Sequence, residues 1–435
     1  MDRLNTKRVF HWILLGGLLS VSGLGLAENV WGQEDPVSWE QYLRESAVSR
    51  EVIETFLDPE EYSWAQFDSE LGYILGRYLP FDGVDGSFTI STSQANGART
   101  ARMYTDRPCR INTYGNSFTQ CHQVSDGETW QEYLAAHLGE PIRNFGMGGY
   151  GVYQSYRRML REEKTELGAE YVLLYVWGDD HLRNLWRCRH AAIFKWWDHD
   201  GGRMFHNNFW PNLEMDLNTG QLLEKENLLP TPESLYQMTD PEFMYRSLEN
   251  DLALQMFIFS RGLINEIDGE AVSQLARHLG LPPPDLEAAQ NPREEVGKIL
   301  NKYGFLATKY VLGKAREFAE ANGKKLMIIL FDPSRSMRQL IETGSRYDQE
   351  IVDFLTENSY FFFDMNVVHA RDFKEVGGSL EDYRRRYFIG HYSPRGNHFF
   401  AFAIKPRIVE WLDPKPITYQ PSDQRMIDFR GYLPD

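Results

Sequence analysis

Cysteine is scarce in this chain. Its 435 residues include only Cys109, Cys121 and Cys188, which excludes a scaffold held together by disulfide bonds. An exported chain could form one bridge at most, and Cys109 with Cys121 is the natural pair to test. The cysteine spacings match no metal-ligand pattern, so we predict neither a metal nor another cofactor.

A dense basic patch is also missing. The formal net charge is −16, and the longest basic run is the segment 384–386 (RRR). Binding to duplex nucleic acid needs a strongly basic face. The composition therefore argues against a nucleic-acid partner, and a run of three arginines beside tyrosines is typical of a solvated helix face.

Long apolar runs are confined to the N-terminus. Arg3 and Lys7 precede the apolar run 10–27, which ends in small residues. This pattern predicts a signal peptide over residues 1–27 and a secreted or periplasmic protein. An uncleaved membrane anchor is the alternative, because the run approaches spanning length. No later segment is apolar enough to span a bilayer, so we expect no stable membrane insertion after signal removal.

The remainder of the chain has the composition of a large globular protein, with 42% hydrophobic and 14% aromatic residues. Short apolar runs alternate with helical apolar stripes from Cys109 onward, and this rhythm predicts an α/β protein with a doubly wound, five-stranded parallel sheet of flavodoxin-like type. Ligands of such sheets bind at the carboxyl ends of the strands. The expected strands are 111–113, 142–145, 171–177, 326–331 and 360–363.

The alternation is interrupted by an aromatic-rich stretch that we interpret as a largely helical insertion capping the site. Its tryptophans include Trp186, Trp196, Trp197 and Trp210. The predicted organisation is a signal peptide (1–27), a helical preamble (28–80), a small β-hairpin region (81–108), the α/β domain in two parts (109–184 and 301–412), the insertion between them (185–300) and a C-terminal tail (413–435).

A candidate nucleophile follows the first predicted strand. The segment 115–119 (GNSFT) places Ser117 two residues past Gly115, between a strand and a helix. A glycine there allows a sharp turn, which exposes the serine hydroxyl at the top of the sheet. Taken alone, this signal is weak, because such turns also occur without a catalytic role.

Further segments make the pattern specific. The segment 115–119, followed by 126–130 (DGETW), resembles the first sequence block of the SGNH or GDSL-like hydrolases, and 144–151 (NFGMGGYG) is similar to their second block. The resemblance implies that Ser117 is the nucleophile of an esterase. It also implies that the backbone N–H groups of Ser117 and Gly149 bind the oxyanion.

The third block departs from the family pattern. The family has an asparagine that donates to the oxyanion, whereas the segment 177–181 (WGDDH) has Asp179 at that position. A carboxylate donates a hydrogen bond only when it is protonated. Either the pKa of Asp179 is raised, or its side chain points elsewhere and the oxyanion hole relies on backbone N–H groups.

The last block supplies the general base. The segment 390–398 (GHYSPRGNH) resembles the C-terminal block of the family, which implies that His391 is the base, with His398 as the alternative. The usual aspartate three residues before the histidine is replaced by Phe388. A serine and histidine dyad oriented by a backbone carbonyl would still function. The candidates for the missing acid are Asp180, Asp179, Asp364 and Asp382.

The sequence therefore predicts a secreted serine esterase that hydrolyses acyl esters, in particular acetyl esters, through a Ser117–His391 acyl-enzyme mechanism. The expected partner is a small acyl ester or an acylated polysaccharide. The tryptophans of the insertion either stack on sugar rings or form the core of the insertion itself. An O-acyltransferase of the same fold and a non-catalytic glycan-binding protein are the alternatives.

Overall fold

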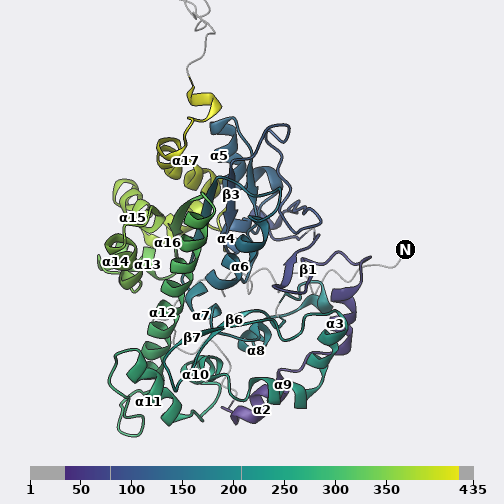
Figure 1. The fold of residues 1–435 in the computed structure, drawn as a ribbon, viewed down its shortest axis with the longest axis vertical. Helices are drawn as coiled ribbons and strands as arrows, with labels where there is room; N and C mark the ends of the chain where they lie inside the picture. Colours follow the sequence, from purple (N-terminus) through teal and green to yellow (C-terminus); the bar gives the residue numbers. More distant parts are fainter. Residues whose placement is uncertain (1–34, 79, 207, 421–435) are drawn as a thin grey trace, which may run out of the picture.

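The α/β part of the molecule is built around a parallel β-sheet, whose strand β3 is labelled in the upper half of Figure 1. The computed structural model describes residues 35–78, 80–206 and 208–420. Its five strands pair in the order β4-β3-β5-β8-β9, and every pair is parallel, as predicted. This order is typical of flavodoxin-like sheets. The strands are β3 (Ile111–Tyr114), β4 (Ile142–Asn144), β5 (Tyr171–Val176), β8 (Lys325–Leu330) and β9 (Phe362–Asp364).

Helices cover both faces of the sheet. Along β5, residues 172, 174 and 176 belong to one apolar cluster, and residues 171, 173 and 175 belong to another. Successive side chains of a strand point to opposite faces, so a strand buried on both sides reads as a continuous apolar run. On one face lie α6 (Val152–Glu162) and α12 (Pro292–Ala321), and on the other lie α5 (Trp130–Leu138) and α17 (Pro394–Trp411).

The aromatic-rich stretch between β5 and α12 contains short helices, as predicted, and also a two-stranded antiparallel sheet that the sequence pattern did not indicate. Its tryptophans Trp186 and Trp210 are buried, whereas Trp196 and Trp197 are half-buried. The elements are α7 (Asp180–Arg183), α8 (Arg189–Ile193), β6 (Asn212–Met215), β7 (Leu222–Lys225), α9 (Pro241–Leu248), α10 (Leu252–Ser260) and α11 (Gly269–His278).

The segment before the sheet packs against this stretch. It contains α2 (Trp39–Glu45), α3 (Arg50–Leu57) and the hairpin of β1 (Ala65–Asp68) with β2 (Gly72–Leu75). The Trp39 indole Nε1 donates to the Glu249 carbonyl at 3.0 Å, and the Tyr42 hydroxyl donates to the Ala191 carbonyl at 2.9 Å. The N-terminal segment and the insertion therefore share one apolar core.

One helix connects that core to the sheet. Helix α12 is 30 residues long and begins at Pro292, so its first turns lie within the range predicted for the insertion. It packs on α10 at one end and on β8 and α14 (Gln349–Glu357) toward the other. The remaining helices of the α/β part are α13 (Ser336–Glu342), α15 (Met365–Val376) and α16 (Leu380–Tyr387).

Two local features are resolved by the structure. The segment 81–108, predicted as a small β-hairpin region, has a short 3₁₀ turn (Val84–Gly86) and isolated antiparallel bridges, such as that of Ser93 with Arg99, in place of extended strands. Cys109 and Cys121 are free, so this pair forms no disulfide bond in the structure. The predicted signal peptide lies outside the described residues. Among the residues that are described, no helix combines the length and apolar character needed to cross a membrane.

Candidate active site

The candidate nucleophile lies at the carboxyl end of β3. Ser117 is the first residue of α4 (Ser117–Gln120), and the side chain of Asn116 caps this helix by accepting from the Phe118 N–H at 2.9 Å. Gly115 is required here, because a Cβ on it would lie 2.2 Å from the Thr119 hydroxyl. The turn is therefore fixed by close packing and a cap.

The carboxylate of Asp180 stabilises the turn that carries Ser117. Its buried carboxylate accepts from the Asn116 amide at 2.9 Å, from the Trp177 N–H at 2.9 Å and from Arg183 at 3.0 Å. Burial raises the pKa of Asp180 to about 7, although Arg183 acts in the opposite direction. Because the carboxylate contacts Asn116 and not His391, the interpretation of Asp180 as a triad acid does not agree with its position.

Ser117 and His391 meet at this edge of the sheet, although 274 positions separate them in the chain. The His391 Nε2 lies 2.7 Å from the Ser117 Oγ. The His391 Nδ1 lies 3.0 Å from the Gln123 Oε1, which can only accept a hydrogen bond. The proton of a neutral His391 ring is therefore on Nδ1, and Nε2 is free to accept the serine proton.

Gln123 occupies the position of a triad acid. Its Oε1 also accepts from the His391 backbone N–H at 2.8 Å, and its Nε2 donates to the carbonyls of Asp82 and Ile389 at 3.2 and 3.1 Å. These donors fix which end of the amide faces the imidazole. None of the aspartates that the sequence suggested forms a hydrogen bond with His391: Asp364 pairs with Arg346, and Asp382 is exposed on α16.

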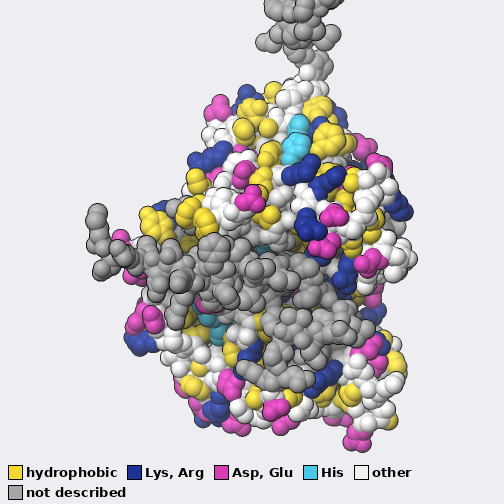
Figure 2. Space-filling view, turned by 180° about the vertical axis from the view of Figure 1, so that it is seen from behind, with side chains coloured by type: hydrophobic (Ala, Val, Ile, Leu, Met, Phe, Trp, Pro, Cys, Tyr) yellow, Lys and Arg dark blue, Asp and Glu magenta, His cyan; other side chains and the backbone are white. Residues whose placement is uncertain are grey.

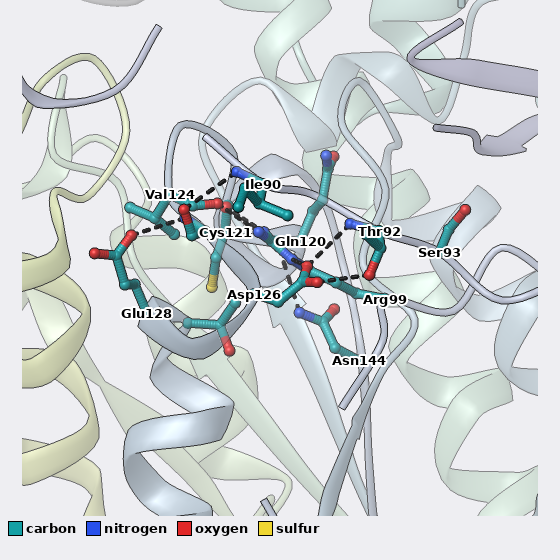
Figure 3. Close-up of polar contacts among 12 residues, drawn as sticks. Ile90, Thr92, Ser93, Arg99, Gln120, Cys121, Val124, Asp126, Glu128 and Asn144 are labelled. Carbon is teal, nitrogen blue, oxygen red and sulfur yellow. Dashed lines mark hydrogen bonds and ion pairs between the residues drawn. The ribbon is translucent and has the colours of Figure 1, made fainter. Parts of the chain in front are cut away.

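The turn that carries Gln123 is held by Arg99, which is almost fully buried (Figure 3). The Arg99 guanidinium donates to the carbonyls of Gln120 at 2.7 Å and Cys121 at 2.6 Å, and also to the carbonyl of Val124. Cys121 and Gln123 both have positive φ, at 60° and 71°. Such conformations cost of order 1–3 kcal/mol each unless the surroundings enforce them, and the Arg99 contacts supply that constraint.

Burial gives His391 an unusual electrostatic state. Burial, reinforced by the neighbouring His122 ring at 5.1 Å, lowers the pKa of His391 to about 3. The His122 Nε2 itself lies 3.0 Å from an Asp82 carboxylate oxygen. His391 is therefore neutral at physiological pH, as a general base must be. No carboxylate among the described residues is hydrogen-bonded to the ring, and Asp82 acts on it only through space, in the direction that raises the pKa of His391.

Two backbone N–H groups of cavity-lining residues could serve as oxyanion donors. Those of Ser117 and Gly149 have no acceptor among the residues that the structure describes. Gly149 has a φ of 83°, and a Cβ on it would lie 2.7 Å from the Tyr73 hydroxyl. Asp179 lines the same cavity, and its half-exposed carboxylate lies 3.9 Å from Arg183.

A cavity of about 340 Å³ opens over Ser117 and His391. The ends of β5 and β8 contribute Trp177 and Asp332, and the insertion contributes Trp196 and Trp197. His398 is not among the lining residues, because it lies exposed on α17 with its ring 5.3 Å from Tyr133. Of the two candidate bases, only His391 reaches the serine.

Comparison with models of known protein families finds no match, and no curated protein matches the chain. The predicted residues Ser117, Gly149 and His391 line one cavity, and Gln123, which contacts His391, was not predicted. Gln123 lies in a loop six residues past the serine, and no spacing or residue type marks it in the sequence.

Proposed function

We propose that this protein is a serine hydrolase that cleaves ester bonds. The observation that carries the proposal is the 2.7 Å contact between the His391 Nε2 and the Ser117 Oγ, next to the unpaired N–H groups of Ser117 and Gly149. A nucleophile, a base within hydrogen-bonding reach and an oxyanion site are the three parts that acyl transfer requires.

More particularly, we propose an exported esterase of the SGNH type that removes acyl groups, such as acetyl, from carbohydrate. The resemblance of four sequence blocks and the order of the parallel strands support the type. The indoles of Trp177, Trp196 and Trp197 line the cavity above the serine. Flat aromatic rings of this kind pack on the apolar faces of sugars.

In the proposed reaction, the His391 Nε2 takes the proton of the Ser117 hydroxyl while Oγ forms a bond to the acyl carbon. The carbonyl oxygen takes up the negative charge and accepts hydrogen bonds from the two backbone N–H groups. The bond to the alcohol oxygen then breaks, and His391 returns its proton to that oxygen. In the second half, the His391 Nε2 takes a proton from a water molecule, whose oxygen forms a bond to the acyl carbon. The bond between that carbon and the Ser117 Oγ then breaks, the acid leaves, and His391 returns the proton to Oγ.

Gln123 fulfils only part of the role of a triad acid. Its carbonyl holds the imidazole in the required tautomer and orientation, as an aspartate would. A neutral amide, however, stabilises the imidazolium less than a carboxylate does. We therefore expect a slower enzyme than one with a Ser–His–Asp triad of the same geometry.

The direct test is labelling with a fluorophosphonate probe, followed by hydrolysis of p-nitrophenyl acetate. We expect the wild-type protein to be labelled at Ser117, and Ser117→Ala to lose the labelling and at least about 10³-fold in kcat/KM. Absence of labelling in folded wild-type protein would favour the glycan-binding alternative. Release of acylated sugar in place of free acid, when an oligosaccharide is added, would indicate an acyltransferase.

A further inference from the structure

The wall of the cavity is rich in arginine, although the chain as a whole has a net charge of −16. Four arginines line it, and they come from three helices and one loop: Arg183, Arg189, Arg335 and Arg384. On the face drawn in Figure 2, cationic and anionic side chains are intermixed wherever the side chains are coloured. Three aspartates, Asp82, Asp179 and Asp332, line the same cavity, so the arginines exceed the carboxylates there although acidic residues are in excess in the chain.

Two of these guanidinium groups form no short contact with a carboxylate. Arg183 pairs with Asp180 at 3.0 Å. Arg335 and Arg384, in contrast, form no ion pair with any residue that the structure describes. The Asp332 carboxylate acts on both only through space: one of its oxygens accepts from the backbone N–H groups of Ser334 and Arg335 at 2.9 and 3.1 Å, and the other has no hydrogen-bond partner among the described residues.

Both arginines are held in place for binding. The Arg335 guanidinium lies 3.5 Å from the centre of the Tyr347 ring, and only 9% of the residue is exposed. Arg384 is half-buried on α16, and burial together with the charge of Arg338 lowers its pKa. An arginine whose charge is disfavoured by burial and by a like charge gains most from an anion.

The position of these arginines indicates which part of a substrate carries the anion. In the proposed reaction, His391 returns its proton to the departing alcohol, so the alcohol lies on the His391 side of Ser117. Arg384 precedes His391 by one loop, and Phe388 and Gly390 in that loop line the same wall. The oxyanion site at Gly149 follows β4, on the other side of β3 from β5 and β8.

We propose that Arg335 and Arg384 bind a carboxylate on the alcohol part of the ester, so that the substrate is an acylated uronate-containing saccharide. This inference rests on the proposed esterase function, and it specifies that the alcohol part of the substrate is anionic. A planar guanidinium pairs with a carboxylate in a bidentate arrangement. The tryptophans of the cavity then pack on the sugar rings beside that pair.

The test measures binding separately from turnover. Binding of a short oligogalacturonate and of a neutral oligoxylan of equal length is measured by calorimetry with the full-length Ser117→Ala protein. We expect the uronate to bind at least about tenfold more tightly, and high salt to reduce this difference. Arg384→Met, which keeps the apolar stem, should weaken uronate binding about tenfold, and Arg384→Lys should restore part of it.

Arg385→Met is the matched control, because Arg385 is the next residue on α16 but its side chain is 68% exposed. It should leave uronate binding unchanged. Equal affinity for both saccharides, or an equal loss from Arg385→Met, would overturn the inference. So would a preference of the wild-type enzyme for p-nitrophenyl hemisuccinate over the acetate, since the anion would then belong to the acyl part. Failure of the esterase function would appear separately, as absence of fluorophosphonate labelling.

Discussion

The two halves of the candidate site are held by different chemistry. On the serine side, a buried carboxylate, Asp180, fixes Asn116 and thereby the turn that presents Ser117. On the histidine side, a neutral amide, Gln123, fixes His391. Acidic residues are common in this chain, which has 62 of them, so the neutral choice beside the imidazole is not explained by a lack of acids.

This difference shows that positioning and charge stabilisation are separable tasks. The serine turn needs only rigidity, and the hydrogen bonds of Asp180 provide it. The imidazole needs rigidity and, during reaction, a counter-charge, and Gln123 provides only the first. The following predictions test this division, beginning with the largest effect.

Removing the base should cause the largest loss. We expect His391→Ala to lower kcat/KM for p-nitrophenyl acetate by about 10³-fold, because the Ser117 hydroxyl loses its proton acceptor. His398→Ala is the matched control, since His398 is exposed on α17, and it should retain wild-type activity. An equal loss in both variants would mean that the activity does not depend on the Ser117–His391 contact.

Removing the serine-side carboxylate should destabilise the fold. Asp180→Ala leaves the Asn116 amide and the Trp177 N–H without an acceptor. Unsatisfied buried donors cost about 1–3 kcal/mol each, so we expect the free energy of unfolding in urea to fall by about 3 kcal/mol. The half-exposed neighbour Asp179 serves as the control, and Asp179→Ala should change it by less than about 1 kcal/mol.

Removing the histidine-side amide should affect activity more than stability. We expect Gln123→Ala to lower kcat by about 10²-fold, because the imidazole loses the acceptor that fixes its tautomer. The KM should change little, because the amide does not contact the acyl group. A rise in KM with an unchanged kcat would show that Gln123 shapes the cavity and does not orient the base. Thermal unfolding of the variant provides the check on folding.

The smallest effect concerns pH. The lowered pKa of His391, about 3, means that the ring stays neutral through the weakly acidic range. We therefore expect kcat/KM to lack a limb near the ordinary histidine pKa of about 6.5. Gln123→Glu places a carboxylate beside Nδ1, which favours the imidazolium and raises the pKa. The kcat/KM of this variant should then fall as the pH drops below the raised pKa of His391. A wild-type limb near neutrality would contradict this assignment.

Much of the sheet could be predicted from the sequence, because β5 and β8 are apolar runs buried on both faces. The candidate site residues at strand ends and glycine turns could be predicted as well, because the positions of Ser117 and Gly149 are set by local backbone geometry. The lack of extended strands in the segment 81–96 could not be predicted, because this segment is held by side chains distant in the sequence. Thr92, for example, donates to the Asp126 carboxylate through both its N–H and its hydroxyl, at 3.0 and 2.6 Å.

The residue that orients His391, and the role of Asp180, could not be predicted, for a physical reason. Asp180 follows β5 where family resemblance suggests a functional residue, but its partners are set by how β3 and β5 pair. Gln123 reaches His391 only because Arg99 holds a turn with two residues at positive φ. Neither of these tertiary contacts can be recognised from the periodicity or the composition of a single sequence.

The long helix α12 has a consequence for the cavity over Ser117. At 1.5 Å per residue, its 30 residues extend for about 45 Å without a break, from the core shared by the insertion and the N-terminal segment to the sheet. A continuous helix of this kind resists hinge bending between the two parts of the molecule that it connects. We therefore expect the cavity over Ser117 to keep its shape when a ligand binds.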